Sequence, residues 1–562
     1  MAIEKRRLGN ILVNAGKITS FQLQEALKAQ KSLGKKLGEI LVDSKIITED
    51  EIIEAIEQQT GIKKIDLNTI EFNRKAISLI PENLCKKYTL IPFGFENNRI
   101  KVTLADPLNI FAIDDVAIST GFEIESFISR KADINKYIGI YYSSQQVDNA
   151  AIQLSKESTK ALKKAKENVD VISDVNSAPV VRMVDYMFKN SIELKASDIH
   201  IEPFENEIRI RYRIDGKLRT INKLGIESLA PLVTRIKIMA GLNIAEKRIP
   251  QDGKIMIKVD DKEIDLRISV LPVVFGEKVV IRILNKGSGI IRKEDLGMDE
   301  ENIKKVNRII SNPHGIILVT GPTGSGKSTT LYSILSELNS NELNIITVED
   351  PVEFTMNGIN QVNVNEKAGL TFASGLRSIL RQDPDIVMIG EIRDEETAEI
   401  AIRAAITGHL VLSTLHTNDA PSSIARLIDM GIKPYLVSTS VAGIIAQRLV
   451  RKICSNCKKS YEASDYEKRV LGKDINDRLI LYKGCGCGYC QETGYTGRIG
   501  IYEIMELTRK HRQAIDSEVT SDVLRDIGIE NGMNTLEMEC KKLVLQGVTT
   551  MEEFETITTL EV

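Results

Sequence analysis

Short apolar runs alternate with amphipathic stretches along the second half of the chain. The runs at 316–319, 345–348, 386–389 and 410–412 are almost wholly apolar, and helical patterns separate them. Strands that are apolar on both faces and alternate with helices are typical of a mainly parallel sheet covered on both sides. The pattern therefore predicts an α/β domain over residues 291–562.

A second α/β domain is predicted at residues 176–290. The run 208–214 alternates strictly between apolar and charged residues, and Asp215-Gly216 follows it as a hairpin turn. Residues 143–175 are polar and contain no glycine, so we interpret them as a hinge segment with some helix that precedes this domain.

An internal repeat occupies the start of the chain. The segment 7–13 (RLGNILV) returns as 36–42 (KLGEILV). Each copy predicts a short helix, a turn and a capped helix, and Thr48 and Glu51 have the spacing of a capping box. One copy alone cannot bury its apolar stripe, so the two are expected to pack together. With the mixed α/β pattern that follows, they predict an N-terminal module at residues 1–142.

The composition is that of a globular protein with several domains. The chain has 562 residues, of which 42% are hydrophobic and 27% are charged. Lysine and arginine together number 75 against 78 acidic residues, which gives no argument for binding a nucleic-acid polymer. The sequence has no apolar run of about 18 residues and no apolar core of a secretion signal near its start, so we expect a cytoplasmic protein.

Residues 321–328 (GPTGSGKS) fit the phosphate-loop pattern G-x-x-x-x-G-K-[ST] without deviation, between a predicted strand and a predicted helix. The glycines of this motif let backbone N–H groups converge on phosphate oxygens, and the helix N-terminus adds its positive end. Lys327 is expected to reach the β- and γ-phosphates of ATP, and the Ser328 hydroxyl to bind Mg²⁺. The predicted ATP-binding residues are Gly321, Pro322, Thr323, Gly324, Ser325, Gly326, Lys327, Ser328 and Thr329.

Glu349, Glu391 and His416 each follow a predicted strand of the same sheet. The carboxyl ends of parallel strands share the edge at which ligands bind. The two acids are therefore candidates for acting on the metal ion and the attacking water, with helix caps as the alternative. His416 is a candidate for sensing phosphate, with a purely structural role as the alternative.

The cysteines gather near the C-terminal end. Cys454-x-x-Cys457 and Cys487-x-x-Cys490 form two knuckles, and four thiolates complete a tetrahedral Zn²⁺ site with no open position. Such a site is expected to be structural. Cys485 leaves an ambiguity, because Cys485-Gly-Cys487 offers one more thiol to the same site.

Long motifs resemble those of the secretion ATPase superfamily. GPTGSGKST, IITVEDPVEF, LRQDPDIVMIGEIRDEETAEIA and TGHLVLSTLHTNDA are similar to its Walker A, Asp box, Walker B and His box. The stretches 196–203, 211–216 and 245–253 resemble the domain that precedes its motor core. More narrowly, nearly the whole chain is similar to the type IV pilus extension ATPases and the type II secretion ATPases.

The resemblance implies an α/β fold with a RecA-like P-loop core, preceded by a PAS-like α/β domain and a small N-terminal helical and α+β module. It places a zinc insert at 451–498 and helices at 505–562, and the segment after Cys490 favours Cys487 over Cys485. It also implies a homohexamer that hydrolyses ATP at subunit interfaces. The expected partner is an inner-membrane platform protein, at the cytoplasmic face of the membrane.

The resemblance also assigns roles to single residues. Glu391 matches the Walker B glutamate that polarises the attacking water. Glu349 matches the Asp-box acid, and His416 belongs to the His box. Arg267 and Arg282 match arginine fingers of the preceding domain, and a guanidinium near the γ-phosphate offsets the charge that builds up there. Without the resemblance, both arginines would be interpreted as solvent-facing strand residues.

Arg7, Leu8 and Gly9 open a segment that resembles the cyclic-di-GMP-binding module found in front of some of these ATPases. Arginine can stack on guanine and pair with phosphate. The second copy departs from the pattern, because Lys36 replaces arginine and Lys45 replaces glycine. Two interpretations stay open: cyclic-di-GMP binds here as a regulator, or the module docks on the platform protein.

The leading hypothesis is a hexameric ATPase that powers pilus extension, and the alternative within the family is a type II secretion motor. A regulatory scaffold with little turnover is the third hypothesis, and the intact Lys327, Ser328 and Glu391 argue against it. The near-neutral composition disfavours a DNA-translocating motor. A retraction motor is disfavoured because, within this family, it usually lacks the front module and the cysteine knuckles.

Overall fold

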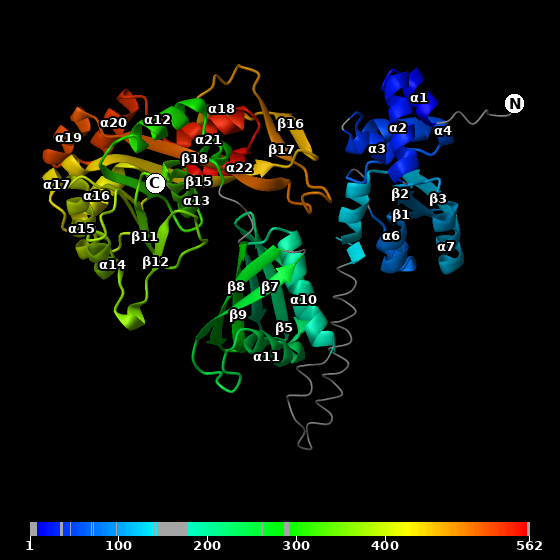
Figure 1. Cartoon of the computed structure of the whole chain (residues 1–562), viewed down its shortest axis with the longest axis horizontal. Helices are drawn as coiled ribbons and strands as arrows, with labels where there is room; N and C mark the ends of the chain where they lie inside the picture. Colours follow the sequence, from blue (N-terminus) through cyan, green and yellow to red (C-terminus); the bar gives the residue numbers. More distant parts are fainter. Residues whose placement is uncertain are drawn as a thin grey trace. The chain divides into compact units, whose positions relative to one another are not determined.

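The computed structural model of the chain describes residues 8–33, 37–44, 46–68, 70, 72–96, 98–139, 141–142, 178–259, 262–285 and 291–558. Its helices and strands are labelled along the chain in Figure 1. The predicted hinge at 143–175 lies outside the described residues, as do Arg7, Lys36 and Lys45.

The first of two compact units is formed within Met1–Glu193, Pro203–Ile208 and Lys223–Ile238. Its N-terminal part contains the helices α1 (Leu8–Asn14), α2 (Ser20–Leu33), α3 (Leu37–Asp43) and α4 (Glu49–Thr60). The capping box of α4 is present, because the Glu51 side chain accepts a hydrogen bond from the backbone N–H of Thr48 at 2.9 Å and the Thr48 hydroxyl accepts one from Glu51 N. The predicted helix, turn and capped helix of each repeat are confirmed.

A three-stranded sheet follows in the same unit. Its order is β1-β2-β3, with β2 antiparallel to β1 and parallel to β3. Tyr137 and Phe72 stack within its core at a centroid distance of 4.9 Å. The elements of this part and the later helices of the unit are β1 (Leu90–Glu96), β2 (Arg99–Leu104), β3 (Glu123–Ile128), α5 (Arg74–Leu79), α6 (Glu82–Tyr88), α7 (Ile110–Thr120), α10 (Ala178–Glu193) and α11 (Leu229–Met239).

A six-stranded sheet has the order β6-β5-β4-β9-β8-β7. The predicted alternation is confirmed in β5, where Ile208, Ile210 and Tyr212 are buried and the charged residues between them are less so. Asp215 and Gly216 both have positive φ, as the centre of a type I′ turn requires. The strands are β4 (Asp198–Pro203), β5 (Glu207–Ile214), β6 (Lys217–Gly225), β7 (Gln251–Val259), β8 (Lys262–Val273) and β9 (Gly276–Asn285).

The second unit contains a seven-stranded sheet in the order β12-β11-β13-β14-β10-β15-β18. All neighbouring strands pair in parallel except β18, which is antiparallel to β15. The predicted parallel-rich α/β sheet is therefore confirmed. The strands are β10 (Gly315–Thr320), β11 (Ile345–Glu349), β12 (Asn360–Asn363), β13 (Ile386–Ile389), β14 (Leu410–Leu415), β15 (Val441–Ile453) and β18 (Tyr495–Glu506).

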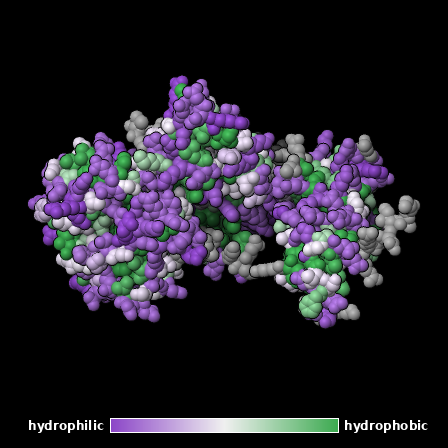
Figure 2. Space-filling view, turned by 90° about the horizontal axis from the view of Figure 1, so that it is seen from above, coloured by the Kyte–Doolittle hydropathy of each residue, from purple (hydrophilic) through white to green (hydrophobic). Residues whose placement is uncertain are grey.

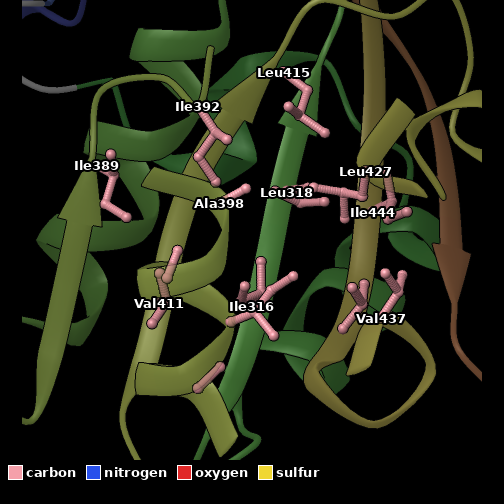
Figure 3. Packing of buried hydrophobic residues seen from close by; sticks show 14 of the residues in the cluster. Ile316, Leu318, Ile389, Ile392, Ala398, Val411, Leu415, Leu427, Val437 and Ile444 are labelled. Atoms are coloured by element: carbon pink, nitrogen blue, oxygen red, sulfur yellow. The ribbon is translucent and has the colours of Figure 1, made fainter. Parts of the chain in front are cut away.

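Both faces of this sheet are buried. Along β10, Ile316 and Leu318 belong to one apolar core, and Ile317 and Val319 belong to another. Successive strand residues point to opposite faces, so an all-apolar strand needs a core on each side. Figure 3 shows the first of these cores. The helices around the sheet are α12 (Glu300–Ile310), α13 (Lys327–Leu338), α14 (Phe372–Ile379), α15 (Glu395–Ile406), α16 (Pro421–Asp429) and α17 (Pro434–Ser440).

The C-terminal part differs from the prediction in one boundary. Helices were expected from residue 505, but β18 continues to Glu506 as the partner of β15, and the first helix begins at Arg509. The remaining elements are β16 (Lys458–Glu462), β17 (Ile480–Gly484), α18 (Asp465–Val470), α19 (Arg509–Asp516), α20 (Ser521–Glu530), α21 (Leu536–Leu545) and α22 (Met551–Thr558).

Hydrophilic residues cover most of the face shown in Figure 2, and hydrophobic residues form separate patches among them. Within the described part of the chain, every helix is too short or too polar to cross a membrane. Apolar residues form cores around the sheets.

Candidate active site

The phosphate loop connects the carboxyl end of β10 to the first turn of α13. Gly321 and Gly326 have φ values of 143° and 90°, a backbone conformation that favours glycine. A Cβ atom at Gly321 would lie 2.4 Å from the backbone oxygen of Gln447 on β15. The loop is therefore folded tightly against β15, with the N-terminus of α13 directed to the phosphate position that the motif predicts.

Lys327 is the first residue of α13 and lies along the phosphate loop. Its Nζ donates hydrogen bonds to the backbone oxygens of Gly321 at 2.7 Å and Pro322 at 3.1 Å. Burial lowers the pKa of Lys327 to about 8, and the positive charge of Arg448 acts in the same direction. The negative charge of Glu391 opposes this shift. Ser328 follows in the same turn and is exposed. Its hydroxyl is thus open to a Mg²⁺ ion carried by a triphosphate.

Glu349 ends β11 and is buried, with 4% of its surface exposed. Its carboxylate accepts hydrogen bonds from Thr347 Oγ1 at 2.6 Å, from Gln361 Nε2 at 3.1 Å and from the Tyr332 hydroxyl. Burial raises the pKa of Tyr332, so this hydroxyl keeps its proton and acts as the donor. Because Tyr332 belongs to α13, Glu349 links β11 to the helix that carries Lys327.

Glu391 follows β13 and meets the His box. Its side chain is 16% exposed, and its Oε2 lies 3.4 Å from Nε2 of His416. Its other oxygen pairs with Arg393. His416 follows β14, the parallel neighbour of both β13 and β10. The structure therefore brings Glu391 and His416 together at the sheet edge that carries the phosphate loop.

Thr417 connects the His box to the phosphate loop. Its hydroxyl lies 2.6 Å from Oγ1 of Thr320, and its backbone N–H donates to the same oxygen at 3.0 Å. Thr320 is the last residue of β10, directly before the phosphate loop. The two loops are thus joined by hydrogen bonds.

Arg267 and Arg282 are directly opposed on β8 and β9. Arg282 is paired with Asp198, whose Oδ1 lies 3.2 Å from its Nε. Arg267 lies 3.7 Å from Glu353, four residues beyond Glu349. The structure brings the two arginines together, and each forms an ion pair with an acid of its own chain, Glu353 or Asp198.

Two residues of β15 border the site although no sequence motif contains them. Gln447 donates from Nε2 to the backbone oxygen of Ser325 at 2.6 Å. Arg448 donates to Oδ1 of Asn418 at 3.0 Å. The available signal was a polar pair inside an otherwise apolar run, 444–450, but no motif marks it.

The four predicted zinc ligands gather at one place. The sulfur atoms of Cys454, Cys457, Cys487 and Cys490 all lie within 4.8 Å of one another. Three of these pairs are separated by 3.9, 3.8 and 3.7 Å. Sulfur atoms placed tetrahedrally at about 2.3 Å from Zn²⁺ would be about 3.8 Å apart. The donor set and its spacing therefore fit a zinc ion.

Cys485 is exposed and does not belong to this group of sulfurs. Within the group, burial acts to raise the pKa of Cys490, but N–H groups of Gly494 and Cys487 directed at its sulfur hold that pKa at about 7. Thiolate is the form that binds metal. The arrangement thus favours the charged form at one ligand, and it selects Cys487 over Cys485.

In the N-terminal repeat, Arg7 lies outside the described residues, while Leu8 and Gly9 begin α1. Gly9 is buried, and a Cβ atom there would lie 2.5 Å from a methyl group of Leu23. In the second copy a Cβ atom at Gly38 would lie 3.3 Å from Ile52. Close packing between helices of each copy therefore accounts for both glycines.

Residues 173–556 match the family model described as "Type II/IV secretion system protein". Residues 60–148 match the model of the MshEN domain. The chain belongs to the type II/IV secretion system protein family. This confirms the resemblance seen in the Walker, Asp-box and His-box motifs. The MshEN match begins at the end of α4, so it covers the β1-β2-β3 sheet and not the repeat.

Relatives of two kinds are similar to this chain. The type IV pilus assembly ATPase PilB of Myxococcus xanthus is 41% identical over 560 residues, which cover 97% of this chain and 98% of the relative. The PilB of Pseudomonas aeruginosa is 40% identical and covers 89% of both chains. The type II secretion system protein E of Pseudomonas aeruginosa is 47% identical over 422 residues, 74% of this chain and 84% of the relative.

Among solved structures, the Legionella pneumophila ATPase DotB has a TM-score of 0.51 and 22% sequence identity to this chain. The match covers 67% of this chain and 95% of DotB. At this identity the likeness concerns the fold alone. It agrees with the α/β architecture built around the seven-stranded sheet.

Proposed function

We propose that the chain hydrolyses ATP to ADP and phosphate and uses the energy to assemble type IV pili. The observation that carries this proposal is the contact of Glu391 with His416 beside the phosphate loop. Lys327 and the N–H groups of the loop would hold the β- and γ-phosphates, and Glu391 would polarise the attacking water. His416, on the loop joined to β10, would report the state of the γ-phosphate.

A bound Mg²⁺ would offset negative charge on the phosphates, and Ser328 is the residue placed to hold it. Glu349 is proposed as the acid that positions the metal side of the site. It would act through Tyr332 and Gln361, because both residues donate hydrogen bonds to its carboxylate.

Pilus assembly is favoured over protein secretion by the extent of the likeness. The pilus assembly relative matches 97% of this chain, including its front module, whereas the secretion relative matches 74%. We infer a homohexamer that acts on an inner-membrane platform protein at the cytoplasmic face of the membrane. In this ring Arg267 and Arg282 would reach the γ-phosphate of a neighbouring subunit.

The cysteine group is proposed to hold a structural Zn²⁺. Four sulfur donors leave no open position for a substrate, and the site joins the end of β15 to the start of β18. For the front module we propose cyclic-di-GMP as the ligand, supported by the MshEN match and by the repeat. The close packing of Gly9 and Gly38 favours the second candidate, a helical docking module for the platform protein.

Three experiments on the full chain test these proposals. Purified protein should release phosphate from MgATP, and Lys327→Ala should abolish this release. In a strain that lacks its pilus assembly ATPase, the wild-type gene should restore pili, whereas restoration of protein secretion alone would favour the secretion motor. Calorimetry with cyclic-di-GMP distinguishes the two candidate functions of the front module. Heat of binding would support the nucleotide, and its absence at high micromolar ligand would favour docking on the platform protein.

A further inference from the structure

Two consecutive polar residues interrupt the apolar run of β15 at the edge that carries the phosphate loop. Gln447 is 1% exposed and Arg448 is 8% exposed. Consecutive residues of a strand point to opposite faces of the sheet. Gln447 accordingly contacts the phosphate loop, and Arg448 contacts the loop that follows β14. A single strand thus touches both loops of the site.

The phosphate loop is shaped around Gln447. The side-chain Nε2 of Gln447 donates to the backbone oxygen of Ser325 at 2.6 Å. A Cβ atom at Gly326 would lie 3.0 Å from that Nε2, and one at Gly321 would lie 2.4 Å from the backbone oxygen of Gln447. Both glycines of the motif therefore make room for the same residue.

Two polar atoms in this contact lack hydrogen-bond partners. Among the described residues, the Oε1 atom of Gln447 and the hydroxyl of Ser325 are buried and have no hydrogen-bond partner. An unpaired buried polar group costs free energy, and the hydroxyl is a donor while the amide oxygen is an acceptor. A hydrogen bond between these two atoms would let Gln447 hold Ser325 through both ends of its amide.

Arg448 holds the other loop. It donates to Oδ1 of Asn418 at 3.0 Å. Asn418 lies two residues after His416, which contacts Glu391, and one after Thr417, which is bonded to Thr320. Burial is the main cause of the lowered pKa of Lys327, and the positive charge of Arg448 lowers it further. Arg448 therefore has an electrostatic effect on the phosphate site.

We propose that Gln447 and Arg448 are positioning residues of the nucleotide site: Gln447 fixes the phosphate loop and Arg448 fixes the loop that carries His416. Strand β15 thereby keeps the two loops aligned, so that nucleotide bound on the first is presented to Glu391 and His416 on the second. This inference rests on the proposed ATP hydrolysis and adds to it two residues that no motif contains.

Steady-state kinetics of full-length variants test the two roles separately. Gln447→Met keeps the volume and removes the donor and the acceptor, so KM for MgATP should rise about tenfold while kcat stays within about twofold. Arg448→Gln should lower kcat about tenfold with little change in KM, since the loop of His416 loses its tether. Arg448→Lys can still donate to Asn418 and should recover most of kcat.

Arg451→Gln is the matched control. Arg451 lies on the same strand, is 7% exposed and is bound to Glu552 and Glu553, remote in sequence from both loops. A merely structural role for Gln447 and Arg448 would lower the melting temperature and the active fraction as Arg451→Gln does, without splitting KM from kcat. That outcome, or wild-type kinetics in both variants, overturns the inference.

The affinity for a fluorescent ATP analogue is measured in parallel. It tests Gln447 independently of turnover, because an unchanged dissociation constant in Gln447→Met overturns the role of this residue. An absence of hydrolysis in the wild-type chain that binds the analogue refutes the proposed function instead.

Discussion

The Nε2 atom of His416 lies 3.4 Å from the Oε2 atom of Glu391, across the ends of two neighbouring parallel strands. Arg393 occupies the second oxygen of the same carboxylate. Glu391 is thus oriented by two basic residues. A carboxylate has more lone pairs than these two partners use, so Glu391 can also accept a hydrogen bond from a water molecule. The loop of His416 is joined to the phosphate loop through Thr417.

Replacement of this carboxylate should separate binding from chemistry. Glu391→Gln keeps the shape of the side chain but removes the charge that polarises water, so we expect wild-type ATP affinity and a kcat lowered by about 10²-fold or more. Phosphate release and the affinity for a fluorescent ATP analogue are the two measurements. Glu399→Gln is a suitable control, because Glu399 pairs with Arg403 on the surface of α15. An unchanged kcat would remove Glu391 from the catalytic role.

Nucleotide affinity should depend on pH through Lys327. Burial lowers the pKa of Lys327 to about 8, so the lysine loses its positive charge as pH rises through that value. ATP binds the charged form, and affinity should therefore fall above about pH 8, by up to about tenfold for each pH unit. Titrations with a fluorescent ATP analogue from about pH 7 to about pH 9.5 measure this dependence.

Lys327→Arg is the control for the pH dependence. An arginine side chain keeps its charge over the whole range, so any affinity that this variant retains should not vary with pH. If the wild-type affinity were also constant up to about pH 9.5, the lysine would not titrate in this range and its lowered pKa would have no part in binding.

The alternation of apolar strands and helices was sufficient to predict the parallel core, since β10, β11, β13 and β14 are apolar on both faces. The strands β15 and β18 were not predicted. Gln447, Arg448 and Arg451 interrupt the apolar run of β15, and each is buried because of a partner far away in the sequence. Local patterns contain no information about such partners.

The candidate site follows the same rule. Glu391 and His416 were predicted to lie at one sheet edge because parallel strand ends meet there, and the structure places them in contact. The surroundings of Glu349 were not predictable, since its hydrogen-bond donors Tyr332 and Gln361 belong to α13 and β12. Motif spacing gives the identity of a residue at the site, whereas its hydrogen-bond partners depend on tertiary packing.

Loss of zinc should weaken the C-terminal region. Cys457→Ser removes one of four sulfur ligands, and a structural zinc site contributes its binding free energy to folding. With a loss of several kcal/mol, the melting transition of this region should fall by about 10 °C. Differential scanning calorimetry, together with metal analysis, measures both effects. Cys485→Ser, which changes an exposed cysteine outside the sulfur group, should melt as the wild type does; equal melting of both variants would argue against the metal.

Mixed rings should show whether Arg282 acts on a neighbouring subunit. Arg282 is 61% exposed at its side chain and is bound to Asp198 of its own chain, so it is free to exchange this acid for a phosphate at an interface. Arg282→Ala and Lys327→Ala should each be inactive alone. When the two proteins are mixed, interfaces that combine an intact Lys327 with an intact Arg282 should regain part of the wild-type phosphate release.

Arg403→Ala, which alters a surface pair on α15, controls for the effect of exchange itself. Mixtures that stay as inactive as their components, while light scattering shows that subunits exchange, would place the arginine at the nucleotide of its own chain or away from the site.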